Sequence, residues 1–116
     1  MTKRILLAED NELNMKLMND ILVVKGYDVT CVTDGEEALK QIEANDFDLI
    51  LLDMQMPKKS GYEVLSEMTK KIPVIIVSAY ARPEEIEKAK QYDFVDYVTK
   101  PINVISFLKK VADDLN

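Results

Sequence analysis

The feature that most constrains this chain is a regular alternation of short apolar runs with segments of helical spacing. Apolar runs of strand length recur at residues 5–8, 29–32, 49–52, 74–77 and 95–99. Leu49–Leu52 and Val74–Val77 are apolar at every position, which is typical of strands covered on both faces. Strict alternation of strand and helix predicts an α/β fold with a doubly wound parallel sheet and right-handed crossovers.

The intervening segments carry start and stop signals for helices. Asp34, with Glu37 three residues on, predicts one helix start, and Pro83 predicts another. Gly26 and Pro73 are expected to end the first and third helices. The third helix is expected to begin near Gly61 and the fifth near Asn103. Each helix has a predicted buried stripe: in the first, Leu13, Leu17, Ile21 and Val24; in the second, Ala38, Leu39 and Ile42; in the third, Val64, Leu65 and Met68; in the fourth, Ile86 and Ala89; and in the fifth, Val104, Leu108, Val111 and Leu115.

Length and composition exclude several classes of protein. The 116 residues suit a single domain, 1–116, and no apolar run approaches the length of a membrane span. A net charge of -6 disfavours nucleic-acid binding, and the absence of histidine excludes histidine catalysis and a phosphohistidine of its own. The single cysteine, Cys31, permits no internal disulfide, fits a cytoplasmic location and is expected to be a small buried residue.

Reactive side chains follow four of the five predicted strands. Glu9 and Asp10 close the first run, Asp53 the third, Ser78 the fourth and Lys100 the fifth. Ligands of open parallel sheets bind outside the carboxyl ends of the strands, at the point where strand order reverses. We therefore expect three carboxylates, one hydroxyl and one ammonium to converge at one edge of the sheet.

Three carboxylates placed together repel one another and are costly to remove from water. Lys100 offsets only one of them, and a set of oxygen ligands favours Mg²⁺ as the ion that balances the remainder. Asp53 ends the most apolar run and is expected to be rigidly held, which favours it as a nucleophile that forms an acyl phosphate. Mg²⁺ and Lys100 would stabilise the phosphoryl charge.

The combined motifs resemble those of the receiver domains of two-component response regulators. The resemblance covers the whole chain and is carried by Ala8–Asn11, Leu51–Pro57, Gly61, Ser78–Ala79 and Tyr97–Pro101. Residues 11–17 and 100–103 are most similar to single-domain regulators of the cell-division type and to receiver modules of hybrid histidine kinases. The resemblance implies a flavodoxin-like (βα)5 fold, a five-stranded sheet with strand order 2-1-3-4-5.

The resemblance also implies a metal site around Asp53, the residue that would be phosphorylated. Asp10 would bind Mg²⁺ directly and Glu9 would bind it through water. The backbone carbonyl of Gln55 would complete the protein ligands.

A second group of residues would act on the phosphoryl group and transmit its presence. Ser78 would hydrogen-bond the group, Lys100 would pair with it, and Tyr97 would turn inward as the switch aromatic. Lys100-Pro101 would be a cis peptide bond. The chain departs from many relatives at Ser60, where they have aspartate, and at Tyr92–Phe94, where they have a Gly-Ala pair.

The function expected from these residues is phospho-acceptance with signalling, not turnover of a substrate. A histidine kinase or histidine phosphotransfer protein would be the donor, and slow self-dephosphorylation would remove the group. The fourth helix, fifth strand and fifth helix would contact a downstream protein target, and a phosphorylation-dependent homodimer is left open. No direct partner is expected among nucleic acids or membranes.

Three alternatives remain open at this point. A small aspartate-nucleophile phosphatase typically needs a second aspartate at the position of Gln55. A flavodoxin-like cofactor carrier would place neutral groups where Glu9 and Asp10 stand, because carboxylates repel phosphate. The chain could also be a receiver module excised from a hybrid histidine kinase.

Overall fold

The structure is a computed structural model that describes residues 2–79 and 82–115. Strands and helices alternate along the chain, as the sequence predicts. The strands are β1 Arg4–Ala8, β2 Asp28–Val32, β3 Leu49–Asp53, β4 Val74–Ser78 and β5 Asp96–Thr99. The helices are α1 Glu12–Val24, α2 Gly35–Ala44, α3 Gly61–Glu67, α4 Pro83–Ala89 and α5 Val104–Leu115.

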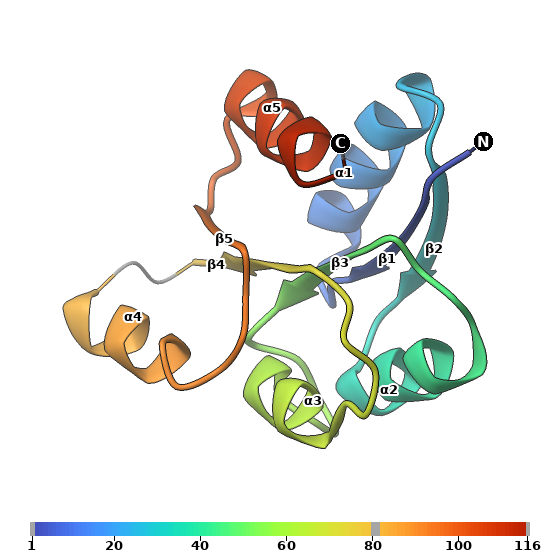
Figure 1. The fold of residues 1–116 in the computed structure, drawn as a ribbon. Helices are drawn as coiled ribbons and strands as arrows, with labels where there is room; N and C mark the ends of the chain where they lie inside the picture. Colours follow the sequence, from blue (N-terminus) through green and yellow to red (C-terminus); the bar gives the residue numbers. More distant parts are fainter. Residues whose placement is uncertain (1, 80–81, 116) are drawn as a thin grey trace.

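The five strands form one parallel sheet between two layers of helices. The strand order is β2-β1-β3-β4-β5, which confirms the predicted doubly wound topology. Figure 1 shows α1 and α5 on one face of the sheet and α2, α3 and α4 on the other. The order reverses between β1 and β3, so the carboxyl ends of these two strands define the edge where a ligand is expected.

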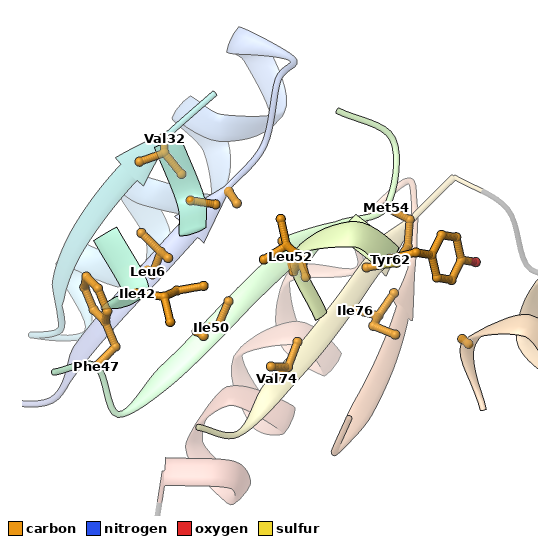
Figure 2. Close-up of a cluster of buried hydrophobic side chains, with 14 residues drawn as sticks. Leu6, Val32, Ile42, Phe47, Ile50, Leu52, Met54, Tyr62, Val74 and Ile76 are labelled. Atoms are coloured by element: carbon orange, nitrogen blue, oxygen red, sulfur yellow. The ribbon is translucent and has the colours of Figure 1, made fainter. Parts of the chain in front are cut away.

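Two separate hydrophobic clusters form on the two faces, because successive strand residues point to opposite sides. On β3, Ile50 and Leu52 join the cluster under α2 and α3, whereas Leu49 and Leu51 join the cluster under α1 and α5. Figure 2 shows the first cluster, which includes Met54 and Tyr62. Every residue of β3 and β4 is buried, in agreement with their unbroken apolar runs.

Several local predictions are confirmed by the helix ends. The Asp34 carboxylate accepts a hydrogen bond from the Glu37 N–H at 2.7 Å, and Pro83 is the first residue of α4. Ser60, one of the departures from many relatives, caps α3 through a reciprocal pair of hydrogen bonds with Glu63. None of the helices in the described ranges is long and apolar enough to cross a membrane.

The buried stripe predicted for the first helix is wrong at three of its four residues; the fourth, Ile21, is partly buried and packs against the cluster under α1 and α5. Met18 and Leu22 are the buried residues of α1, while Leu13 and Val24 are 80% and 83% exposed and Leu17 is 43% exposed. Both sets recur at spacings of three and four residues, so the sequence offers two apolar stripes on one helix. The rotation of α1 over the sheet selects the stripe that contains Met18.

Three smaller predictions also need correction. α3 ends at Glu67 rather than at Pro73, because Met68 takes an extended conformation and its side chain packs against the core. Cys31 is exposed, since it lies on the edge strand β2. On α5 the largest buried side chain is Phe107, which the predicted stripe omits, whereas Val104 is 38% exposed.

Candidate functional site

Three carboxylates meet at the carboxyl edge of the two central strands. Glu9 and Asp10 follow β1, and Asp53 is the last residue of the neighbouring strand β3. One carboxylate oxygen from each residue lies within 4.8 Å of the others. Glu9 and Asp53 are buried, at 0% and 2% exposure, while Asp10 is exposed. The structure therefore brings together the acidic residues that the strand ends predict.

Lys100 reaches the same point from the end of β5. Its Nζ atom lies 2.7 Å from Glu9 Oε1 and 2.9 Å from Asp53 Oδ2. The Lys100 N–H donates to the Ser78 carbonyl at 2.8 Å, and Lys100-Pro101 is the cis peptide bond that the resemblance implies. Three carboxylates and one ammonium leave the cluster with two formal negative charges in excess.

Both oxygens of the Asp53 carboxylate are positioned by neighbours. Oδ2 contacts the Lys100 ammonium, and Oδ1 accepts a hydrogen bond from the Gln55 N–H at 3.0 Å. Gln55 lies in the β3–α3 loop, residues 54–60, which connects Asp53 to α3. A buried carboxylate held at both oxygens has little freedom to rotate, which suits a group that must attack along one line.

The electrostatics of the cluster reflect burial first and the neighbouring charges second. Burial raises the pKa of Glu9 to about 7, with a contribution from nearby Asp53, against the opposing effects of Lys100 and the Asn11 N–H. Burial by itself lowers the pKa of Lys100, but its contacts with Glu9 and Asp53 outweigh burial, so that this pKa is raised. An ammonium held this way stays charged and remains available to an anionic group.

The residues present fit a divalent cation. All three acidic side chains offer oxygen atoms, the ligand type that Mg²⁺ prefers, and a charge of +2 would cancel the excess. Glu9 Oε1 is buried and lacks a hydrogen bond of regular geometry within the described residues, although Lys100 Nζ lies close to it. A buried oxygen in this condition has unused capacity to coordinate a cation or its water.

Ser78 and Tyr97 occupy the strands beside the acidic cluster. Ser78 ends β4 and is 2% exposed, one residue beyond Val77, the partner of Asp53 in the β3–β4 register. Tyr97 lies on β5, half-buried against the cluster under α2 and α3, with its ring 6.2 Å from that of Phe94 at an interplanar angle of 70°. Their expected roles in binding and switching stay predictions, as does the ligand role of the Gln55 carbonyl.

Sequence reasoning missed two groups of residues near the site. The Tyr62 hydroxyl lies 3.2 Å from Glu85 Oε2, and Lys88 Nζ lies 4.2 Å from the Tyr62 ring centre, which ties α3 to α4. Gly35, which follows the predicted helix cap Asp34, contacts the β3–α3 loop. The residues in these contacts are far apart along the chain, so no local sequence motif predicts them.

Comparison with known proteins agrees with this arrangement. The family model described as the response regulator receiver domain matches residues 5–112. This chain belongs to the response regulator receiver family. It is 40% identical to the polar-differentiation response regulator DivK of Brucella ovis, over 99% of this chain and 98% of that protein.

Solved structures of receivers have the same fold. One is the receiver domain of a sensor histidine kinase from Pseudomonas aeruginosa, with a TM-score of 0.90 and 29% identity over 99% of this chain and 98% of that one. That structure is described with a magnesium ion coordinated in its active-site cleft. The response regulator TrrA of Thermotoga maritima, described in complex with Mg²⁺-BeF, has a TM-score of 0.86 and 32% identity, with 98% and 100% covered. The predicted flavodoxin-like fold, with strand order 2-1-3-4-5, is confirmed.

Membership in the family decides the general function. The chain is a phospho-acceptor signalling module of two-component systems, not an enzyme of many turnovers, and such a module has a phospho-donor histidine kinase and a downstream target as partners. The phosphatase alternative is not favoured. The comparisons leave the excised-module alternative open.

Proposed function

We propose that Asp53 accepts a phosphoryl group from a phosphohistidine of a kinase or phosphotransfer protein, with Mg²⁺ held by Glu9, Asp10, Asp53 and the Gln55 carbonyl. One observation carries this proposal. Asp53 is a buried carboxylate whose two oxygens are contacted by Lys100 and the Gln55 N–H. It lies in a cluster with two formal negative charges in excess. Magnesium, when bound, would neutralise that excess and orient the phosphoryl oxygens.

The chain's own residues have distinct tasks in the transfer. A carboxylate oxygen of Asp53 attacks phosphorus, and an O–P bond forms as the P–N bond to the donor imidazole breaks and leaves its electron pair on nitrogen. Lys100, already 2.9 Å from Asp53 Oδ2, pairs with the transferred group. Ser78, at the end of the adjacent strand, donates its hydroxyl to a phosphoryl oxygen.

The signal then passes to the surface formed by α4, β5 and α5. Ser78 moves toward the phosphoryl group, Tyr97 turns inward, and the population shifts toward a second arrangement of α4 that a downstream protein recognises. The thin anchoring of α4, whose buried residue is Ala89, supports its role as the moving element. Slow self-dephosphorylation, the single domain 1–116, the cytoplasmic location and a phosphorylation-dependent homodimer stay predictions.

Phosphorylation by acetyl phosphate tests the proposal directly. With Mg²⁺ present, the wild-type chain should gain the mass of one phosphoryl group, and Asp53→Asn should gain none. Asp93→Asn is the matched control, because Asp93 is an exposed aspartate just before β5, at the opposite edge of the sheet.

Two results would contradict the proposal. Labelling of the Asp53→Asn protein would show that the nucleophile is another residue. Labelling of the wild type that is unchanged after removal of Mg²⁺ with a chelator would remove the metal from the mechanism, and sustained turnover of phosphate esters would favour the phosphatase.

A further inference from the structure

We infer that Gly35, the first residue of α2, is a positioning residue that holds the β3–α3 loop, residues 54–60, in the shape that the acceptor site needs. The inference rests on the proposed function, in which Gln55 of that loop supplies a metal ligand. Gly35 lies outside the acidic cluster and touches none of its carboxylates in the contacts described above. It acts through the backbone of the loop.

The contact between Gly35 and the loop leaves no room for a side chain. The Gly35 N–H donates to the Pro57 carbonyl at 3.3 Å. A Cβ atom added at Gly35 would lie 2.0 Å from the Lys59 carbonyl oxygen and 2.6 Å from its carbonyl carbon. Both atoms are backbone, so they cannot rotate away, and any larger residue must displace the loop or α2.

The loop has a tight turn at the point of contact. Lys58 has a φ of +67°, a conformation that residues other than glycine rarely adopt, and the Lys59 N–H donates to the Pro57 carbonyl at 2.8 Å. The Lys58 ammonium lies 3.8 Å from the Asp34 carboxylate, the cap of α2. Because Lys58 is 62% exposed, this ion pair adds little, and the backbone contacts with Gly35 set the shape of the turn.

The other end of the loop is closed by a second glycine. The Gly61 N–H donates to the Met54 carbonyl at 3.1 Å, and a Cβ atom there would lie 2.7 Å from the Asp53 carbonyl oxygen. Gln55 lies between the two closed ends and donates its N–H to Asp53 Oδ1. A shift of Pro57 and Lys59 therefore has few ways to relax except by moving Gln55, and with it the orientation of Asp53.

Gly35→Ala tests the inference through metal binding, without any activity measurement. A Mg²⁺ titration of the full chain, followed by calorimetry and by amide chemical shifts of residues 9–11 and 53–61, should show an affinity about 10-fold weaker than wild type. Gly26→Ala is the matched control, because Gly26 has a φ of +91° and an added Cβ would meet nothing within 4 Å. It strains the backbone at the α1–β2 turn and should leave Mg²⁺ affinity unchanged.

A second pair of variants keeps the test decisive if Gly35→Ala does not fold. Lys58→Pro forces φ to about −65° and should weaken Mg²⁺ binding, whereas Lys58→Gly permits the positive φ and should preserve it. Wild-type affinity in both Gly35→Ala and Lys58→Pro would overturn this inference and leave the proposed function standing. Failure of the wild type to bind Mg²⁺ would overturn both.

Discussion

Strands β3 and β4 and the α4–β5 region differ sharply in how completely their residues are buried. β3 and β4 are buried at every residue, and their last residues are Asp53, the proposed phosphoryl acceptor, and Ser78, its proposed hydrogen-bond donor. α4 buries Ala89 alone among its residues, and β5 buries Val98 alone. The residues proposed to react therefore lie on the most deeply buried strands, whereas the region proposed to move has the fewest buried residues.

Apart from Ala89, which is buried in the cluster under α2 and α3, α4 is held by side-chain contacts with another helix. Ile86 is half-buried and belongs to neither hydrophobic cluster in the described residues. Tyr62 of α3 contacts Glu85 through its hydroxyl and Lys88 through its ring, and its ring centre lies 5.6 Å from that of Tyr92. A few specific contacts of this kind can be broken one at a time, whereas a packed core cannot.

The difference between the two regions can be tested by truncating one apolar side chain in each and comparing the losses of stability. Leu51→Ala should lower the free energy of unfolding by about 2–5 kcal/mol, because Leu51 is fully buried in β3. Ile86→Ala should lower it by less than about 1 kcal/mol, because its side chain is already half in water. Urea unfolding measures both values. Equal losses would show that α4 is anchored as firmly as the central sheet.

Tyr62→Phe tests the anchor of α4 itself. Loss of the contact between its hydroxyl and Glu85 should cost about 1 kcal/mol and should speed amide hydrogen exchange in α4 more than in α2. Tyr27→Phe is the control, because Tyr27 directly precedes β2, at the edge of the sheet opposite β5. Uniform acceleration of exchange across all helices would contradict a local role for Tyr62.

Tyr62→Phe should also change how the free energy of unfolding depends on pH. Burial, with Glu85 close by, raises the pKa of Tyr62 to about 12. A tyrosine in the unfolded chain ionises near pH ~10, so the unfolded state loses this proton first. Stability contributed by the neutral hydroxyl is therefore present below about pH 10 and is lost as pH rises toward 12. Tyr62→Phe should lose less stability than wild type across this window in urea unfolding.

The smallest change in stability is expected for a substitution of Asp114, near the end of α5. Asp114 Oδ2 is buried without a hydrogen bond among the described residues, and burial, with Asp96 nearby, raises the pKa of Asp114. Ionisation of Asp114 therefore opposes folding above the ordinary aspartate pKa, near ~4, and the penalty is absent at lower pH. Asp114→Asn should stabilise the chain at pH 7 by less than about 1 kcal/mol and should add nothing at acid pH.

Asp113→Asn supplies the control for this prediction. Asp113 is exposed and pairs with Lys109 at 3.2 Å, one turn away on α5, so its replacement should be neutral or slightly destabilising at pH 7. Urea unfolding at neutral and acid pH compares the two variants. A gain in stability for Asp113→Asn as large as that for Asp114→Asn would indicate a general effect of net charge.

The sequence predicted the fold and the acidic cluster well because both depend on local patterns. Unbroken apolar runs identify buried strands, and the residue that ends each run must lie at the carboxyl edge of a parallel sheet. Glu9, Asp53 and Lys100 could therefore be grouped before any coordinates were known. The buried side of α1 could not be predicted, because Met18 and Leu17 lie on two stripes of equal periodicity.

By itself, the sequence determined the alternation of strands and helices and the chemical groups available at the sheet edge. These follow from spacing and residue type along a single stretch of chain. The tertiary structure alone decided which face of α1 is buried, how Gly35 meets the loop after Asp53, and how Tyr62 reaches α4. Each of these depends on the relative placement of segments far apart in sequence, which packing in three dimensions sets and local propensity does not encode.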